Sequence, residues 1–143
     1  MTAEQNKAIV RRFYKAFEAD DEDALNQVLA PDLAAYSHGG PGPQKREAHV
    51  QGIRTWNEAF ANTHFTIEDQ IAEGDKVSTR VILRSVHSGS PFQGLPPTGK
   101  PIAISGISIE RIKDGKIVER QVNSDMLGVM QQLGLVPPPQ PAK

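Results

Sequence analysis

The spacing of apolar residues changes from a helical to a strand period near residue 62, and this change constrains the fold most. Before it, residues 2–19 and 45–61 carry apolar side chains three or four positions apart, which is typical of amphipathic helices. After it, apolar and polar side chains alternate, which is typical of strands with one buried face. Tight-turn signals divide the alternating part at two points, Gly74-Asp75 and Asp114-Gly115. Helices that precede hairpin-linked strands predict an α+β fold.

The order of the elements predicts a cone-shaped α+β barrel. We expect helices at 2–19, 23–29, 45–61 and 124–133, and strands at 32–38, 64–73, 76–88, 101–113 and 116–123. Pro31 is expected to end the second helix. A strongly curved, mainly antiparallel sheet would wrap over the N-terminal helices and leave an apolar pocket at its open end. We therefore expect one domain over residues 1–136 and a disordered, proline-rich tail at 137–143.

Charge and composition narrow the classes of partner. The chain has 16 basic and 17 acidic residues, a balance that gives no electrostatic footprint for nucleic acid or for an anionic membrane. It has no cysteine, which excludes disulfides, thiolate metal sites and cysteine nucleophiles. The N-terminus is charged and lacks a long apolar run, so we expect no signal peptide, no membrane span and a cytoplasmic protein.

The last hairpin is expected to gather polar side chains on one face of the sheet. If its turn has two residues, Gln121 lies opposite Ser108, and Asn123 and Asp125 follow on the same face. The opposite face would carry the apolar side chains of Ile107, Ile109, Val118 and Val122. Because both faces then look buried or half-buried, we expect a homodimer, or a higher homo-oligomer, packed across the sheet.

The first long hairpin leaves one question open. Phe65, Ile67 and Ile71 alternate along their strand, as core residues do. A two-residue turn would nevertheless place them on the face opposite to Val81 and Leu83. Either the turn is longer, or both faces of the sheet are covered.

Four segments of the second half carry a resemblance to a known family. They are IAEGDKVSTR (71–80), HSGSPFQGLPPTGKPI (87–102), GISIERIKDGKIVERQVNSD (106–125) and MLGVMQQLG (126–134). The PPTGK loop, the DGKIVE hairpin and the D-x-LG-x-x-QQLG ending are the most specific parts. They resemble the SnoaL-like polyketide cyclase (ester cyclase) family of the nuclear-transport-factor-2-like superfamily. The resemblance implies an enzyme that closes a ring of a polyketide ester by intramolecular aldol condensation, without a metal or a cofactor.

Asp125 is the leading catalytic candidate, because it matches the acid/base aspartate that the resemblance implies. Aldol ring closure removes a proton from carbon and returns one to oxygen, and a buried carboxyl with a raised pKa can do both. The competing interpretation is that Asp125 caps the helix behind it, since aspartate is among the best N-caps. If Ser124 takes that role instead, Asp125 is left to face the pocket.

Two histidines are the other catalytic candidates. His87 lies at a strand end on the inward-facing side, and His38 stands before a glycine-rich loop. Each is either a side chain that polarises a substrate carbonyl or only a polar residue at the rim. With Asp125 they form a metal triad on paper, but they lack short-range ligand spacing, so we expect no metal. The candidates for substrate contact are Tyr14, Phe17, Tyr36, Trp56, Ser108, Gln121 and Asn123. Gln121 stands where many family members have tryptophan, which changes the pocket.

We therefore expect a cofactor-independent cyclase that acts on a small hydrophobic or polyketide-like carbonyl compound. Two alternatives stay open at this point. One is a non-catalytic protein that binds a small hydrophobic ligand in the same pocket. The other is an epoxide hydrolase or ketosteroid-isomerase type of enzyme, which needs a second carboxylate or an aspartate–arginine pair in the pocket. The inward-facing strand positions suggest no clear partner for Asp125.

Overall fold

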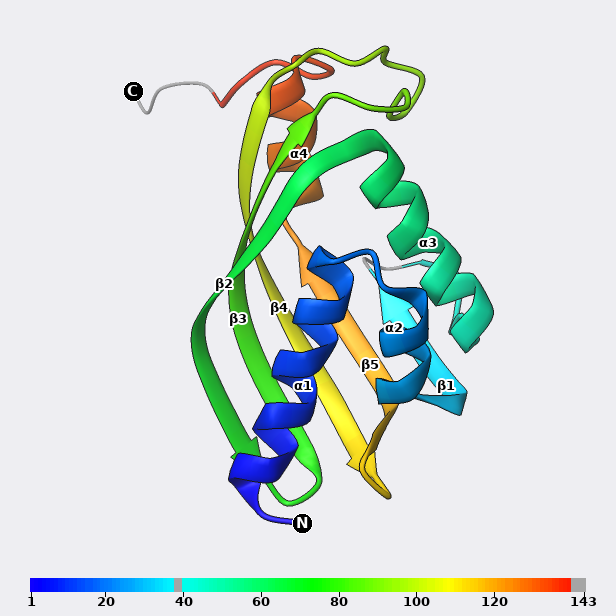
Figure 1. The fold of residues 1–143 in the computed structure, drawn as a ribbon. Coiled ribbons are helices and arrows are strands. Elements are labelled where there is room, and N and C mark those ends of the chain that lie inside the picture. Colours follow the sequence, from blue (N-terminus) through cyan, green and yellow to red (C-terminus); the bar gives the residue numbers. More distant parts are fainter. Residues whose placement is uncertain (38–39, 140–143) are drawn as a thin grey trace.

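The computed structural model describes residues 1–37 and 40–139, so the predicted site residue His38 and most of the predicted tail lie outside the described residues. The elements follow the predicted order (Figure 1): α1 (Ala3–Glu18), α2 (Glu22–Val28), β1 (Leu29–Ser37), α3 (Arg46–Ala59), β2 (Phe60–Glu73), β3 (Lys76–His87), β4 (Pro101–Lys113), β5 (Lys116–Ser124) and α4 (Met126–Leu133). No helix in the described ranges is long and apolar enough to cross a membrane.

The five strands form one mixed, open sheet in the order β1-β5-β4-β3-β2. The strands β2 to β5 form an antiparallel meander, and β1 joins β5 in parallel. Figure 1 shows α1, α2 and α3 on one side of the curved sheet and α4 at one end of it. The α+β prediction is confirmed, and the sheet curves over the helices without closing into a barrel.

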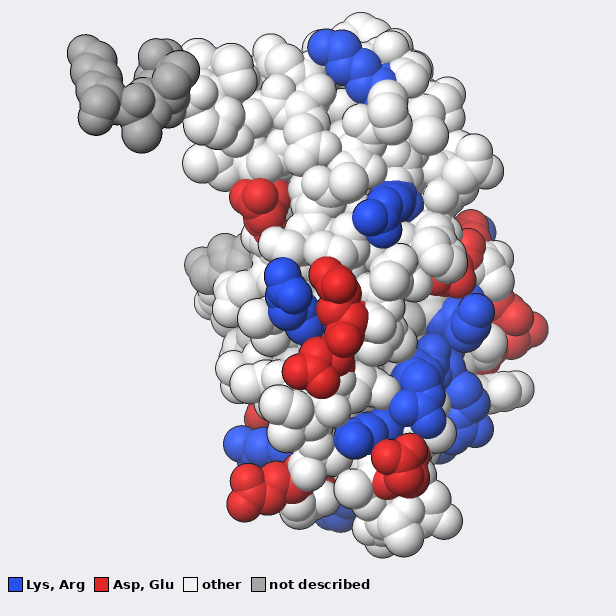
Figure 2. All heavy atoms as spheres, turned by 90° about the vertical axis from the view of Figure 1, so that its left-hand side faces the viewer, with Lys and Arg blue, Asp and Glu red and all other residues white. Residues whose placement is uncertain are grey.

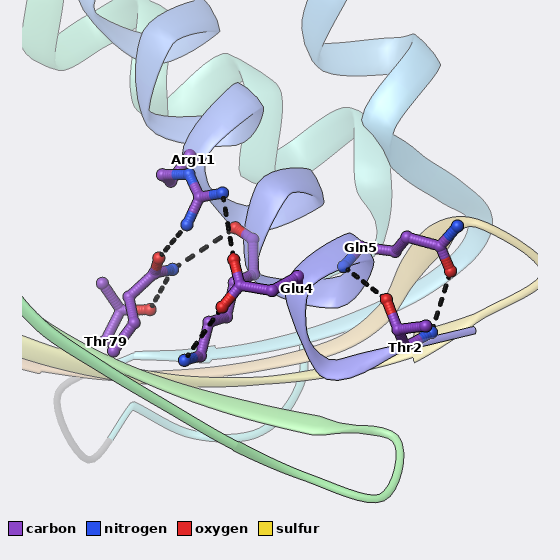
Figure 3. Close-up of polar contacts among 7 residues, drawn as sticks. Thr2, Glu4, Gln5, Arg11 and Thr79 are labelled. Carbon is purple, nitrogen blue, oxygen red and sulfur yellow. Dashed lines mark hydrogen bonds and ion pairs between the residues drawn. The ribbon is translucent and has the colours of Figure 1, made fainter.

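The helix α1 is anchored at its start and along its length (Figure 3). Thr2 and Gln5 form a capping box, in which each backbone amide donates to the other side chain, at 2.8 and 3.1 Å. Further along, Arg11 donates to Gln70 of β2 at 2.8 Å, and Gln70 donates to Thr79 of β3 at 3.1 Å. These contacts hold α1 across two strands and so place its C-terminal half over the middle of the sheet.

The predicted boundary at Pro31 is wrong by a few residues. The helix α2 ends at Val28, and β1 begins at Leu29 and runs through Pro31. Proline cannot donate a ladder hydrogen bond, but an edge strand has one side that needs no donor. Because β1 is the edge of the sheet, it accommodates Pro31.

Two apolar clusters hold the layers together. The helix-side core packs α1, α2 and α3 on the sheet and includes Ile9, Val10, Phe13, Leu25, Leu33, Val77 and Ile117. The α4 core lies at the other end and includes Phe60, Leu83, Ile102, Ile104, Val129 and Leu133. Most residues of both clusters come from the helical stripes and inward strand positions that periodicity predicts.

A β-bulge in β2 answers the question that the first hairpin leaves open. The register shifts by one residue at Glu68, so Ile67 pairs with Val81 and Phe65 pairs with Leu83 on the inward face. Beyond the bulge, Ile71 points outward and is 65% exposed. One extra residue reverses the facing of everything that follows it.

A second bulge, in β5, overturns the predicted register of the last hairpin. Ile112 pairs with Ile117 but Arg111 pairs with Glu119, so Val118 is the extra residue. Ser108 therefore pairs with Val122 and not with Gln121. The inward residues of β5 become Arg120, Val122 and Ser124, whereas Gln121 and Asn123 are exposed on the outer face with Ile107 and Ile109.

Candidate functional site

A cavity of about 260 Å³ lies where the two cores meet, between α1, α3 and the inner face of the sheet. Most of its wall is apolar, with Phe17, Ile53, Trp56, Leu83 and Val122 among the lining residues. Tyr14, His49 and Arg120 supply polar groups to the same wall. An apolar hollow with a few converging polar groups is the usual form of a small-molecule site.

The polar part of the wall is built around a buried ion pair. Arg120 Nε lies 2.9 Å from Glu110 Oε2, and the two side chains are 6% and 0% exposed. They face each other because the bulge at Val118 places Arg120 opposite Glu110 across the hairpin. Arg120 also lies over the ring of Phe13, with Cζ 4.4 Å from the ring centroid.

Three further side chains complete what we call the Glu110 cluster, which consists of Glu110, Arg120, Ser108, Tyr14 and His49. Ser108 Oγ donates to Glu110 Oε1 at 3.0 Å. The Tyr14 hydroxyl lies 2.7 Å from Ser108 Oγ, and Arg120 Nη2 donates to the Tyr14 oxygen at 3.3 Å. Arg120 Nη1 lies 3.4 Å from His49 Nε2. The cluster thus joins α1, α3, β4 and β5 at the cavity.

The hydrogen-bond directions in the cluster follow from its donors. Since the single proton of Ser108 points to Glu110, the Ser108 oxygen accepts from the Tyr14 hydroxyl. An arginine can only donate, so His49 Nε2 accepts from Arg120 and the His49 ring carries its proton on Nδ1. The result is a continuous row of donors from the cavity wall to Glu110.

Burial sets the protonation of the cluster. It raises the pKa of the Glu110 carboxyl, and the Arg120 charge and the Ser108 hydrogen bond offset part of this effect. Burial likewise raises the pKa of the Tyr14 hydroxyl. Burial, helped by the Arg120 charge, lowers the pKa of His49 to about 3. At neutral pH, Tyr14 therefore keeps its proton and His49 is uncharged.

Asp125 lies outside this cluster and caps a helix. Its carboxylate accepts from the backbone amide of Gly128 at 2.8 Å, and Asp125, not Ser124, is the N-cap of α4. The carboxylate packs so closely on Gly128 that a Cβ at that position would collide with it. Asp125 is exposed, although its neighbours Ser124 and Met126 line the cavity. Its catalytic role stays a prediction.

His87 faces inward, as predicted, but it lies in the α4 core and not at the cavity. Its side chain is fully buried against Phe60, with ring centroids 5.2 Å apart. Its Nδ1 accepts from the Thr98 amide at 3.3 Å, which ties the loop after β3 to the strand. The described residues hold no group of three histidine, aspartate or glutamate side chains arranged to bind a metal.

The structure brings some of the predicted substrate contacts together and separates others. Tyr14, Phe17 and Trp56 line the cavity, and Ser108 is buried directly behind Tyr14. Trp56 also stacks on Phe60 at 4.1 Å between ring centroids. The remaining candidates, Tyr36, Gln121 and Asn123, are exposed away from the cavity.

The sequence reasoning missed Glu110, Arg120 and His49. An unbulged hairpin would pair Glu110 with Glu119, and two like charges opposite each other indicate a solvated end of the sheet, whereas the structure pairs Glu110 with Arg120. No local signal in the sequence identifies Val118 as the extra residue. His49 could have been found, because it lies four residues before Ile53 on the buried stripe of α3.

Comparison with known proteins places this geometry in a family. The model of the SnoaL-like polyketide cyclase family matches residues 8–133. Nogalonic acid methyl ester cyclase of Streptomyces nogalater is 29% identical over 124 residues, which are 83% of this chain and 90% of that protein. Aklanonic acid methyl ester cyclase DauD of Streptomyces sp. (strain C5) is 32% identical over 133 residues, with 88% and 80% covered.

Solved structures agree on the fold. The chain is similar to IdmH of Streptomyces antibioticus, a candidate polyketide cyclase, with a TM-score of 0.81, 30% identity and coverage of 91% of this chain and 99% of that one. AclR of Streptomyces galilaeus, a candidate hydroxylase, has a TM-score of 0.87 at 23% identity, covering 97% and 87%. Together with the family model, these similarities show that the chain belongs to the SnoaL-like polyketide cyclase family.

Proposed function

We propose that the protein is a polyketide cyclase that closes a ring of a small carbonyl compound in the cavity between α1, α3 and the sheet, without a cofactor. Its named relatives are cyclases of aklanonic and nogalonic acid methyl esters. The observation that carries the proposal is an apolar cavity whose wall presents a hydrogen-bond donor, Arg120, beside the Tyr14 hydroxyl. Such a wall suits an apolar substrate with a reactive carbonyl group.

An intramolecular aldol reaction fits this wall. A carbon next to a carbonyl loses a proton, the resulting enolate attacks a second carbonyl carbon, and the new alkoxide takes up a proton. Donors that point at the developing oxyanion stabilise it most where water is excluded. Arg120 is such a donor, and the apolar wall would hold the two reacting carbons close together.

Asp125 remains the family-matched proposal for the proton transfer, and the Asp125→Asn variant tests it. Asparagine caps a helix as well as aspartate does but cannot take a proton from carbon. If Asp125 is the acid/base, Asp125→Asn abolishes turnover while the melting temperature stays within a few degrees. Full activity of Asp125→Asn would assign the residue to capping alone.

The direct test of the proposed function uses the methyl esters of aklanonic and nogalonic acid as probes. We expect a product with unchanged mass and a new chromatographic retention time, because ring closure only rearranges the atoms. An Arg120→Met variant should bind the same ester and turn it over far more slowly. If neither ester binds or reacts, the proposal fails, and binding without ring closure would support the non-catalytic alternative.

The ion pair favours a second candidate function, epoxide hydrolysis. A carboxylate–arginine pair beside the pocket is what that type of enzyme needs, and Glu110 and Arg120 supply one. Turnover of a small apolar epoxide in isotopically labelled water discriminates the two functions. A hydrolase inserts one labelled oxygen into its product, whereas a cyclase product contains none.

We also propose that the protein forms a homodimer across the outer face of the sheet. Ile107 and Ile109 are 50% and 44% exposed there. Ile71 lies two strands away from Ile109, and both pair with Ser78 of the strand between them. On this side of the molecule, charges of both signs are separated by broad uncharged areas (Figure 2). An Ile107→Glu variant should turn a dimer into a monomer in light-scattering measurements, and a wild-type monomer would refute the proposal.

A further inference from the structure

Glu110 is the only buried acidic residue in the described part of the chain. It does not line the cavity, yet a row of hydroxyl groups connects it to the cavity wall. Tyr14 lines the cavity and donates to Ser108 across 2.7 Å, and Ser108 donates to Glu110 across 3.0 Å. The cavity thus reaches this buried carboxyl through Arg120 and through two hydroxyl groups, and only the hydroxyl groups can pass a proton between the cavity and Glu110.

We propose, as the alternative to Asp125 and resting on the cyclase function above, that Tyr14 is the catalytic acid/base of the cavity and that Ser108 relays its proton to and from Glu110. In the first step, the proton of the substrate carbon moves to the Tyr14 oxygen. The Tyr14 proton moves to Ser108 Oγ, and the Ser108 proton moves to Glu110 Oε1. After the carbon–carbon bond forms, the same steps run backwards and protonate the new alkoxide, so the enzyme ends unchanged.

The surroundings of Glu110 suit this role. Its raised pKa lets it hold a transferred proton at a pH nearer neutrality than an exposed glutamate can. Arg120 on β5 is the one charged group that faces it in the cluster, since His49 on α3 is uncharged and Tyr14 on α1 is neutral. Arg120 also donates to the Tyr14 oxygen and stabilises negative charge there during the transfer.

The Tyr14 oxygen keeps a lone pair for a substrate proton. It gives its own proton to Ser108 and accepts one hydrogen bond from Arg120. A phenolic oxygen can accept a second proton contact through its other lone pair. The relay therefore needs no rearrangement of the cluster before the substrate binds.

A binding experiment tests the relay without turnover. The acidic phenol 4-nitrophenol, which mimics an enol, is added to the full-length protein about one pH unit below the phenol's own pKa. We expect bound nitrophenol to appear as phenolate in its absorbance spectrum, and infrared difference spectra to show a newly protonated carboxyl group. The proton lost by the ligand is then found on Glu110, and Glu110→Gln removes the infrared band.

The variant Ser108→Ala interrupts the relay and leaves the Glu110–Arg120 pair in place. It should lower the ratio of ionised to neutral bound nitrophenol about tenfold, which is one pKa unit, and Ser108→Thr should restore it. The matched control is Ser85→Ala, which removes a buried strand hydroxyl that bonds to Thr63 outside the cluster and should change nothing.

Three results would overturn the relay. They are an ionised fraction that Ser108→Ala does not change, a carboxyl band that survives in Glu110→Gln, and failure of nitrophenol to bind the wild-type cavity. The cyclase proposal fails separately. If the protein transfers the proton but closes the ring of neither ester, the proposed function is refuted and the relay is not. If Tyr14→Phe retains full cyclase activity, the relay is refuted and the proposed function is not.

Discussion

The β4–β5 hairpin and the turn behind it carry two carboxylates in opposite environments. Glu110 is fully buried, pairs with Arg120 and connects to the cavity through Ser108 and Tyr14. Asp125 is exposed and accepts a hydrogen bond from a backbone amide in the first turn of α4. The family pattern makes Asp125 the candidate for proton transfer, whereas burial and the contacts with the cavity wall make Glu110 the candidate. The comparison teaches that the facing of a strand, and not the type of residue, decides which carboxyl is buried beside the cavity and which is left at the surface.

The two environments also differ in energy. Burying an ion pair costs several kcal/mol of desolvation per ion, and good geometry must offset that cost. An exposed cap has no such cost, because water still reaches the carboxylate. The region around Glu110 should therefore be sensitive to substitution, and the region around Asp125 should tolerate it.

Removing the charge of Arg120 should have the largest effect. In Arg120→Met, Glu110 stays buried without its partner, and we expect the free energy of unfolding to fall by about 3–5 kcal/mol in urea titrations. The double variant Glu110→Gln/Arg120→Met should recover part of this loss, since no charge is then buried. A loss below about 1 kcal/mol in Arg120→Met would show that the pair contributes no more than surface pairs do.

The pH dependence of stability should show that the cluster excludes a charged imidazole. Folded His49 binds a proton only near pH 3, whereas an unfolded histidine binds one near pH 6.5. Between these values the unfolded histidine holds the extra proton, so His49 makes the free energy of unfolding fall as the pH is lowered, by about 1.4 kcal/mol per unit, whereas Glu110, whose folded pKa is raised, contributes with the opposite sign. His49→Gln should flatten this slope.

The cap at Asp125 should contribute less. Asp125→Ala removes the hydrogen bond to Gly128 and should lower the free energy of unfolding by about 1 kcal/mol, whereas Asp125→Asn should change it little. Equilibrium unfolding of both variants measures the difference. An equal loss in both would mean that the carboxylate charge, and not the cap, stabilises this end of the protein.

The smallest net effect is expected at Gly128. Alanine gains about 1 kcal/mol of helix propensity there, but its Cβ displaces the Asp125 carboxylate and loses a cap of similar size. In the Asp125→Ala background, Gly128→Ala should therefore stabilise the protein. Gly52→Ala in α3 is the matched control, because a Cβ there meets open space and should stabilise the wild type directly. Destabilisation by Gly128→Ala in both backgrounds would show a clash with something other than Asp125.

Much of the fold could be predicted because its signals are local. The Thr2–Gln5 capping box and the buried stripe of α1 depend on residues three or four positions apart, and both are present. The same stripe brings Tyr14 and Phe17 to the cavity, as predicted. The sequence allows two interpretations of Asp125, a helix cap and a catalytic carboxylate, and the structure shows the capping geometry.

The site could be predicted less well, because it depends on pairing between strands. An unbulged hairpin places Gln121 and Asn123 toward the pocket, and the extra residue at Val118 turns them outward. His87 shows the same limit in another form. Its inward facing was predicted, but only the packing of Phe60 beside it decides that it belongs to the α4 core and not to the cavity.

The sequence by itself determined the order of helices and strands, the hairpin turns and the aromatic side of the pocket, since each depends on local spacing. The resemblance of its segments to known sequences indicated the family. The tertiary structure decided which side chains of β2 and β5 face inward. Single inserted residues at Glu68 and Val118 reverse the strand facing, and nothing within either strand marks them, because a bulge arises from the fit of one strand against its neighbours. That fit is what places Arg120 opposite Glu110 and leaves Asp125 at the surface.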